Sequence, residues 1–337
     1  MQIVDEIWGE FEVNEPVLIE LLQSKELNRL RHISSAGYYP AIAENTHPQN
    51  TRYIHSVGVF LLLRRFGAPL LEQIAGLLHD VSHSAFSHTI DYIKTDLDGQ
   101  KTQSAQDAVH EKYLQKTSIP SILQKYGINL ADILDDKKFP LKENDLPNIC
   151  ADRLDYTMRN IVIFNLLSQE EIAKIRDSLI VANGSFVFEN AKGANLFCNA
   201  FYFLNEHCWS GFPSAIMFAV SARLFRRALN LGIVSLADFY DFDDDYIIKK
   251  IQENLDKDKK LKAFYDQLNL PPKAFENDLE APIEPIFTKN RIVNPFVRLQ
   301  DTFCRFADMD QTYKSKISKL PKFKEYRVVL NKFAKVA

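Results

Sequence analysis

The stretch His79-Asp80-Val81-Ser82-His83-Ser84-Ala85-Phe86-Ser87-His88 places three histidines and a carboxylate within ten residues. It is the densest part of a larger cluster, because six of the eight histidines of the chain lie between His47 and His110. Histidine is the commonest metal ligand, and its charge changes readily near neutral pH. A cluster of this density beside an aspartate indicates a metal-centred hydrolytic site.

The residues around this stretch predict the helices that would carry the metal ligands. A helical pattern of leucine and isoleucine begins at Pro69 and runs directly into His79 and Asp80. Adjacent residues at a helix end point about 100° apart, so both side chains can reach a point beyond that end. A predicted helix upstream carries His55, and another downstream carries Asp152. Two imidazoles and two carboxylates from three helices form a mixed nitrogen and oxygen set suited to Mn, Fe, Zn or Mg.

The composition of the chain excludes several other classes of protein. Hydrophobic residues make up 46% and charged residues 25% of the 337 residues, which is ordinary for a globular protein. The net charge of −3 gives no electrostatic case for nucleic-acid binding. No apolar run approaches the roughly 20 residues that a membrane helix needs. The four cysteines are scattered without a Cys-x-x-Cys pair, so we expect free thiols and a cytoplasmic location.

Periodicity along the chain predicts a mainly α protein. Glycine is scarce, at 11 residues, whereas phenylalanine reaches 24, and this balance favours helices packed through aromatic side chains. Asn183-Gly184 between apolar segments predicts a small β-hairpin near 179–188, and residues 4–13 alternate as an extended lead-in. We expect residues 1–170 to form a core that carries the histidine cluster. We expect residues 171–337 to form a mainly helical part packed on that core.

Three further segments carry weaker predictions. Residues 94–103 are polar and predict a loop, and residues 105–126 predict a helix with a break at Pro120. Residues 241–260 alternate acidic and basic blocks, which is typical of a solvated helical face.

Several segments, in the same order along the chain, carry a family resemblance. They are Asp5-x-Ile7-x-Gly9, Asn28-Arg29-Leu30-Arg31, Thr51-Arg52-Tyr53-Ile54-His55-Ser56-Val57-Gly58-Val59, His79 to His88, and Ala151-Asp152-Arg153-Leu154-Asp155-Tyr156. These segments resemble the signatures of the HD-domain phosphohydrolases, and specifically of the branch that contains the deoxynucleoside-triphosphate triphosphohydrolases. The last three resemble that branch's "TRFEHSLGV", "HDLGHGPFSH" and "ADRLDY". The resemblance covers roughly residues 4–165 and continues weakly to about residue 300.

The resemblance implies a fold and a metal site. It implies a mainly α HD-domain fold, with residues 1–170 as the catalytic core and a helical C-terminal extension. The family pattern of a His, a His-Asp pair and a distant Asp falls on His55, His79, Asp80 and Asp152. These four residues would hold a divalent metal, whose identity stays open among Mn, Fe, Mg, Zn, Co and Ni.

Further histidines are candidates for proton transfer to the leaving oxygen. Imidazole titrates near the operating pH, which makes His83 and His88 candidates for this step. Asp91 lies three residues after His88 and would orient it if both share one helical face. The pair that begins at His110 resembles a His-Glu pair that the family places at the site.

Four more residues are candidates for substrate binding. Arg52 and Arg153 would bind phosphate oxygens, because a guanidinium makes two parallel hydrogen bonds to them. Tyr156 resembles a family position that contacts the sugar. Asn160 stands where the family has a sugar-facing Asp, and Ser35 begins a Ser-Ala-Gly where the family has Gln-Leu-Gly. These two departures weaken any expectation that the substrate is a deoxynucleotide.

We therefore predict a metal-dependent phosphohydrolase that acts on a small phosphate ester, in the first place a nucleotide. One alternative is phosphomonoester or phosphodiester cleavage of another phosphorylated metabolite at the same site. A second is a regulatory protein that binds metal and nucleotide without turnover. Nucleic acid and membranes are not expected partners, and a homo-oligomer stays open because members of the family commonly form oligomers.

Overall fold

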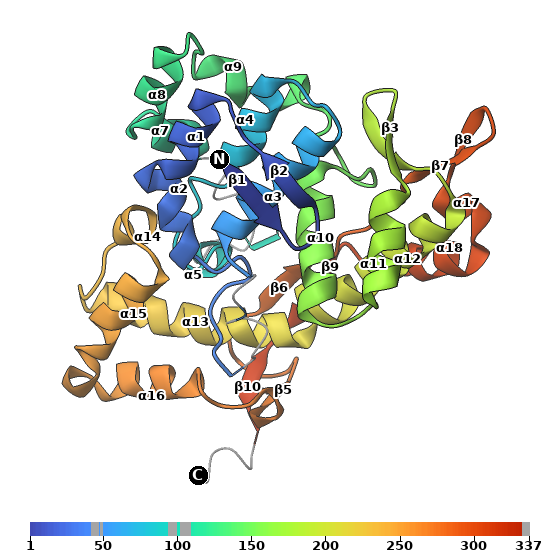
Figure 1. The fold of residues 1–337 in the computed structure, drawn as a ribbon. Coiled ribbons are helices and arrows are strands. Elements are labelled where there is room, and N and C mark those ends of the chain that lie inside the picture. The colour runs from blue at the N-terminus through green and yellow to red at the C-terminus, as the bar shows by residue number, and fades with distance from the viewer. Residues whose placement is uncertain (42–46, 48–49, 94–99, 102–108, 332–337) are drawn as a thin grey trace.

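The computed structural model describes residues 1–41, 47, 50–93, 100–101 and 109–331 of the chain. Residues 94–99 of the predicted polar loop lie outside the described residues, as do residues 105–108 at the start of the predicted helix. Figure 1 shows a molecule built chiefly of helices, with short strands between and beside them. The prediction of a mainly α fold is confirmed.

The first 170 residues begin with a hairpin and continue as helices. Strands β1 (Gln2–Asp5) and β2 (Gly9–Glu12) pair antiparallel, in agreement with the extended lead-in. The helices that follow are α1 (Pro16–Gln23), α2 (Lys25–Arg29), η1 (Leu30–His32), α3 (Arg52–Arg65), α4 (Leu70–Leu78), α5 (Thr89–Ile93), α7 (His110–Leu114), α8 (Ile119–Lys125), α9 (Ala131–Leu134), η3 (Asp136–Lys138) and α10 (Ala151–Ile163).

The remainder of the chain mixes helices with short strands. Its helices are α11 (Gln169–Asp177), α12 (Ala191–Leu204), the π-helical turn η4 (Asn205–Trp209), α13 (Phe212–Asn230), α14 (Asp238–Asp241), α15 (Asp244–Gln252), η5 (Leu255–Lys257), α16 (Lys259–Gln267), η6 (Pro272–Ala274), α17 (Phe306–Met309) and α18 (Gln311–Ser318). Its strands are β3 (Leu179–Ala182), β4 (Ser185–Phe188), β5 (Phe275–Asn277), β6 (Ile286–Lys289), β7 (Phe296–Leu299), β8 (Thr302–Arg305), β9 (Phe323–Tyr326) and β10 (Val328–Leu330).

The predicted hairpin near 179–188 is present, but it belongs to a larger sheet. Strands β3 and β4 pair through a turn with Asn183 and Gly184 at positive φ. Strand β4 then pairs parallel with β7, which gives the sheet order β3-β4-β7-β8. Strands β5 and β6 pair with β10 and β9. The sequence analysis missed the strands between residues 275 and 330, so the C-terminal extension is less helical than expected.

Three helices position the predicted metal ligands, and each has a local cause. The Thr51 hydroxyl accepts a hydrogen bond from the Ile54 amide and starts α3. Helix α4 ends at Leu78, so His79 caps it. Helix α10 begins at Ala151, so Asp152 lies in its first turn. Helix α3 packs against both α4 and α10, which brings the three ligand-bearing segments together.

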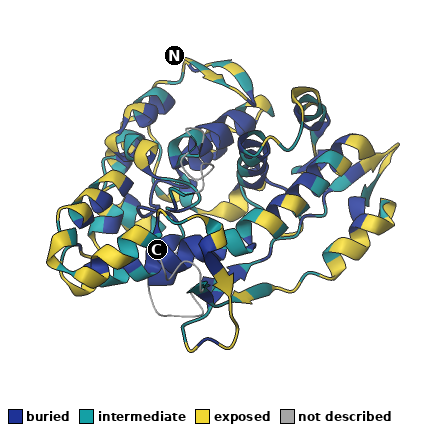
Figure 2. Ribbon diagram, turned by 90° about the horizontal axis from the view of Figure 1, so that it is seen from below, coloured by how far each residue is buried: buried dark blue, intermediate teal, exposed yellow. Residues whose placement is uncertain are grey.

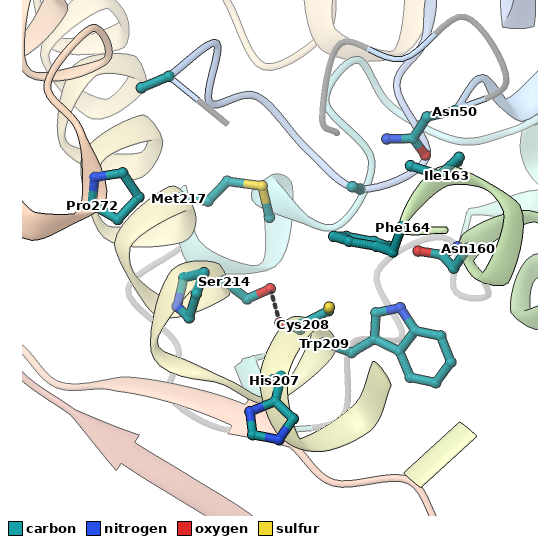
Figure 3. A pocket seen from close by; sticks show the side chains of 13 residues that line it. Asn50, Asn160, Ile163, Phe164, His207, Cys208, Trp209, Ser214, Met217 and Pro272 are labelled. Atoms are coloured by element: carbon teal, nitrogen blue, oxygen red, sulfur yellow. Dashed lines mark hydrogen bonds between the residues drawn. The ribbon is translucent and has the colours of Figure 1, made fainter. Parts of the chain in front are cut away.

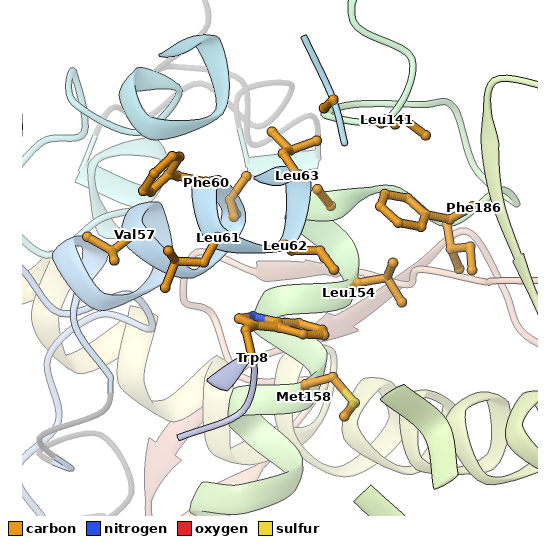
Figure 4. Close-up of a cluster of buried hydrophobic side chains, with 14 of the residues drawn as sticks. Trp8, Val57, Phe60, Leu61, Leu62, Leu63, Leu141, Leu154, Met158 and Phe186 are labelled. Carbon is orange, nitrogen blue, oxygen red and sulfur yellow. The ribbon is translucent and has the colours of Figure 1, made fainter. Parts of the chain in front are cut away.

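Two hydrophobic cores hold the fold, and each takes residues from both halves of the chain. Figure 4 shows part of the first, where Trp8 lies among the side chains of α3 and α10 and Phe186 packs from β4. The second core joins the segment around Phe86 to α13 and α15. Figure 2 shows the buried residues gathered on the inner helices and the exposed residues on the outer faces. The boundary near residue 170 stays a prediction, since neither core stops there.

Candidate active site

The four predicted metal ligands lie together where α3, the end of α4 and the start of α10 meet. His55 Nε2 lies 2.9 Å from Asp152 Oδ1 and 3.3 Å from His79 Nε2. Asp80 approaches from the other side, with Oδ1 3.4 Å from His79 Nε2 and Oδ2 3.7 Å from His55 Nε2. Ligand atoms of His55, His79 and Asp152 all lie within 4.8 Å of one another. This group could therefore hold a metal ion.

The hydrogen bonds of the two imidazoles orient them for metal binding. His79 Nδ1 donates to the Gly76 carbonyl oxygen at 2.7 Å, and His55 Nδ1 lies 2.8 Å from Asp155 Oδ2. A neutral imidazole that donates through Nδ1 presents the lone pair of Nε2. The two Nε2 atoms lie only 3.3 Å apart. When both rings are neutral, a cation between them would remove the repulsion between their lone pairs, so the residues fit a divalent metal.

The charges at the site also favour a cation. Burial lowers the pKa of His55, but hydrogen bonds to Asp152 and Asp155 outweigh it and raise that pKa to about 9. Burial raises the pKa of Asp152, but His55 and His79 hold it well below its usual range. The carboxylates therefore stay ionised and favour positive charge on His55. A bound metal would supply that charge in place of a proton.

Asp155 is a functional residue that the sequence analysis did not single out. It is fully buried, and its carboxylate accepts hydrogen bonds from Trp8 Nε1 at 2.6 Å and from Arg159 Nε at 2.8 Å, beside His55 Nδ1. A Cβ on Gly58 would lie 2.0 Å from Asp155 Oδ1, so this close approach requires glycine. A carboxylate behind a ligating histidine fixes its tautomer and raises its basicity. The three-residue spacing between Asp152 and Asp155 was the available signal.

Arg52 does not point freely toward a substrate but holds Asp80 and two loops. Its Nη1 donates to Asp80 Oδ2 at 2.7 Å, and its Nε donates to Ser87 Oγ at 2.9 Å. A third donor, Nη2, reaches the Ser35 carbonyl oxygen at 3.0 Å. Burial raises the pKa of Asp80, but Arg52 and the nearby histidines lower it well below its usual range. Phosphate binding by Arg52 therefore stays a prediction.

The structure places His83 and His88 next to the metal ligands. His83 Nε2 lies 3.4 Å from Asp80 Oδ1, and the rings of His83 and His88 meet edge to face with centroids 5.3 Å apart. His88 Nδ1 lies 3.6 Å from Asp91 Oδ2. Burial lowers the pKa of both histidines, although Asp91 opposes this effect at His88. Both imidazoles are therefore neutral near pH 7.

His110 reaches the same region from α7. Its Nδ1 lies 2.7 Å from Ser82 Oγ, in the loop between Asp80 and His83. Burial, with a further contribution from Lys142, lowers the pKa of His110 to about 4. Residues 102–108, just before it in the chain, lie outside the described residues.

The Arg153 guanidinium also makes its hydrogen bonds to groups of the protein itself. Its Nη1 donates to the Asn148 carbonyl oxygen at 2.8 Å, and its Nη2 donates to Glu143 Oε1 at 3.2 Å. Glu143, Cys150 and Asp152 could form a second metal-binding group by distance. The Arg153 guanidinium, however, lies 3.2 Å from both Cys150 Sγ and Glu143 Oε1 and already supplies a positive charge there. In the structure Arg153 holds the loop before α10, and its phosphate contact stays a prediction.

A pocket lies near the far end of α10 from the metal ligands, and Asn160 on that helix lines it. Asp152, Tyr156 and Asn160 recur every four residues, so successive side chains lie about 6 Å apart on one face. Tyr156 meets the ring of Trp209 edge to face at 5.1 Å. Asn160 lines a cavity of about 360 Å³, and Figure 3 shows Phe164, Trp209, Met217 and Pro272 around it. Apolar side chains dominate this lining, and among the described residues that form it only His207 and the Cys208 thiol are titratable.

Two imidazoles and two carboxylates that meet at the ends of three helices are typical of a helical metal-dependent hydrolase. The model of the HD domain matches residues 52–160. The metal-dependent phosphohydrolase cns2 of Cordyceps militaris is 37% identical over 239 residues, which cover 69% of this chain and 67% of that protein. The chain belongs to the HD-domain metal-dependent phosphohydrolases. The predicted family, enzyme class and divalent metal are thereby confirmed.

Two further comparisons concern the fold and the substrate. A solved structure of a hypothetical protein from Aquifex aeolicus covers 99% of this chain, with 97% of its own length matched, at a TM-score of 0.69 and 18% identity. The two proteins share their fold. The deoxynucleoside triphosphate triphosphohydrolase SAMHD1 of Xenopus laevis is 29% identical over 153 residues, which cover 39% of this chain and 23% of that protein.

Among the described residues, no helix is long and apolar enough to cross a membrane.

Proposed function

We propose that this phosphohydrolase acts on a nucleotide, with the phosphate at the metal ligands and the nucleoside in the pocket. One observation carries the proposal: Asp152, Tyr156 and Asn160 share one face of α10, and Asn160, two turns beyond the metal ligand Asp152, lines a largely apolar cavity. Aromatic and apolar walls with a few polar groups are typical of sites for flat organic ligands. The partial likeness to a deoxynucleoside triphosphate triphosphohydrolase supports the same class of substrate.

In this proposal His55, His79, Asp80 and Asp152 hold the divalent metal. When bound, such a metal lowers the pKa of a coordinated water and polarises a phosphoryl oxygen. Asp155 keeps His55 in the tautomer that presents Nε2, and the Gly76 carbonyl does the same for His79. Arg52 holds the Asp80 carboxylate in place and keeps it ionised.

His83 and His88 serve proton transfer, with Asp91 and His110 in support. Both imidazoles are neutral before the substrate binds, because burial lowers their pKa. A phosphate dianion beside them would raise that pKa, since an opposite charge favours the protonated form. The histidine that faces the leaving oxygen would thus take up a proton on binding and deliver it as the ester bond breaks.

A second reaction at the same site, removal of a single phosphate, is favoured by the state of the two arginines. Arg52 and Arg153 are both committed to protein acceptors. A triphosphate carries more negative charge than a monophosphate and needs more cations to bind it. Fewer available cations suit a substrate with one phosphate. The cytoplasmic location stays a prediction, and the formation of a homo-oligomer stays open.

A product analysis separates these reactions. Purified protein would be incubated with ribo- and deoxynucleoside mono- and triphosphates and with p-nitrophenyl phosphate, under Mn, Fe, Mg, Zn, Co or Ni. Tripolyphosphate among the products would identify triphosphohydrolase action, and orthophosphate would identify removal of one phosphate. His79→Ala is the matched inactive control. Stoichiometric nucleotide binding without any product under all six metals would overturn the proposal and favour a regulatory protein.

A further inference from the structure

The segment between Asp80 and His88 has a strained backbone. Phe86 and Ser87 have φ values of 59° and 50°, the left-handed region that residues other than glycine rarely adopt. Such a conformation is energetically unfavourable and persists only where its surroundings hold it. The turn directly precedes His88, so its conformation sets where that imidazole points. The contacts that hold the turn are therefore part of the site.

The groups that hold this turn come mainly from the far half of the chain. The Ala85 amide donates to the Phe239 carbonyl oxygen at 2.6 Å, and the Phe86 amide donates to Asp244 Oδ1 at 2.7 Å. The Phe86 ring stacks on Phe225, with centroids 4.5 Å apart and an interplanar angle of 23°. Two hydrogen bonds and one aromatic stack thus tie the turn to α13, α14 and α15.

Asp244 links this turn to a second loop and, through it, to a metal ligand. Its Oδ2 accepts from the Ser34 amide at 2.9 Å. The Ser34 carbonyl oxygen accepts from the Ser87 hydroxyl, and that hydroxyl accepts from Arg52 Nε at 2.9 Å. Arg52 in turn donates to Asp80. One carboxylate therefore fixes both loops that flank the Arg52–Asp80 pair.

Asp244 does this at an electrostatic cost. It is buried, although the sequence placed it on a solvated helical face. No basic side chain of the described residues pairs with it, and its charged neighbours are Asp243 and Asp245 at the start of α15. Tyr38 is the titratable group that faces it from the other loop. A buried carboxylate without a cation is unfavourable for folding, which points to a role in the site.

We propose that Asp244 is a positioning residue that holds the Phe86-Ser87 turn and so directs His88 and His83 toward the phosphate. The proposal rests on the proposed function, because these histidines are its proton-transfer groups. It assigns to α15 of the C-terminal part a role in completing the active site. Asp244 touches no substrate and acts through the backbone of the turn.

Asp244→Asn tests the proposal in the full-length, metal-loaded protein. The amide has nearly the same shape, but its NH₂ group cannot accept, so one of the two backbone amides loses its acceptor. Asp258→Asn is the matched control, since Asp258 also accepts a backbone amide, that of Leu261, and pairs with Arg227 away from the site. Hydrogen–deuterium exchange of residues 81–93 and the kinetics on the best nucleotide or p-nitrophenyl phosphate would be measured for both variants.

We expect faster exchange of residues 81–93 in Asp244→Asn and not in Asp258→Asn. We also expect kcat to fall about tenfold or more while KM stays within about twofold and metal stoichiometry is unchanged. Unchanged exchange, or faster exchange with wild-type kcat, would overturn the positioning role. A wild-type protein without any turnover would overturn the proposed function instead, and the exchange data would still report on the turn.

Discussion

Two buried carboxylates, one behind the metal ligands and one behind the histidine turn, are held in opposite ways. Asp155 accepts from Trp8, His55 and Arg159, and although burial raises its pKa, Arg159 and His55 lower it below the usual value. Asp244 accepts two backbone amides, and burial raises its pKa to about 7. In the metal region, Arg159 and His55 thus balance the negative charge of Asp155. At the turn, no cationic side chain of the described residues balances the charge of Asp244. The first arrangement suits a permanent cation site, and the second holds a strained backbone.

Removal of a metal ligand tests the metal region most directly. In His79→Ala and Asp152→Ala we expect loss of stoichiometric metal and a fall in kcat/KM of more than about 1,000-fold, because the metal's contribution to the transition state is worth several kcal/mol. Metal analysis of the purified variants and kinetics at saturating metal would measure both effects. Substoichiometric metal in the wild type that neither variant alters would show that the ligand set is wrong.

Disruption of Asp155 should have a smaller but still large effect. In Asp155→Asn, and in Gly58→Ala where a Cβ would lie 2.0 Å from Asp155 Oδ1, we expect metal affinity to fall about 10- to 100-fold. Gly193→Ala is the control, because its Cβ would meet Ser178 Oγ at 1.8 Å, away from the metal ligands. Calorimetric titration of the metal-free proteins with Mn would measure the affinities. Equal affinities in Gly58→Ala and Gly193→Ala would show that Asp155 does not orient His55.

The difference between the two regions also decides what the sequence could predict. His79 and Asp80 directly follow a short amphipathic helix, and Asp152 lies in the first turn of another, so helical periodicity together with the family resemblance was enough to propose them as ligands. Asp155 lies on the same helix face as Asp152 and was within reach of the same reasoning. Its contact with Trp8 spans 147 residues, which no local pattern encodes.

The turn and its support were out of reach of the sequence for the same reason. Asp244 lies 158 residues from Phe86, inside a charged segment whose alternation favoured a solvated face. The missed strands have three or four residues each, too short for a clear alternation of polar and apolar side chains. Strands β5 and β10 pair across about fifty residues, Phe275 with Leu330. Mainly helical content was predictable because helices depend on contacts within four residues.

The two carboxylates should also differ in how they make the free energy of unfolding depend on pH. The pKa of Asp244 is about 7 in the folded protein against 3.8 as the ordinary value, so the folded state binds the extra proton. Its stabilising contribution is full below about pH 4 and is lost as the pH rises through 7. We expect the free energy of unfolding of the wild type to fall faster over pH 4 to 7 than that of Asp244→Asn, by at most about 1.4 kcal/mol per pH unit. Asp155 behaves in the opposite sense. Because its pKa is lowered in the folded protein, its stabilising contribution is present near neutral pH and is lost in acid, as the pH falls through that pKa.

Urea unfolding of both proteins at saturating metal, at each pH, would give these slopes. The metal ligands titrate in both proteins, so their contribution cancels in the difference. Parallel slopes for wild type and Asp244→Asn would mean that Asp244 is already ionised at low pH. The contrast with Asp155 would then be lost.

An exposed ion pair sets the lower end of the comparison. Lys262 Nζ lies 3.0 Å from Asp266 Oδ2 on α16, with both side chains more than half exposed. Water solvates both of these charges, so burial does not destabilise them and the ion pair stabilises them only slightly. We expect Lys262→Ala to change the free energy of unfolding by no more than about 0.5 kcal/mol and to leave kcat unchanged. A larger loss, measured by the same urea unfolding, would mean that distance alone governs these pairs. The opposite behaviour of Asp155 and Asp244 could then no longer be assigned to burial and to the charge of their partners.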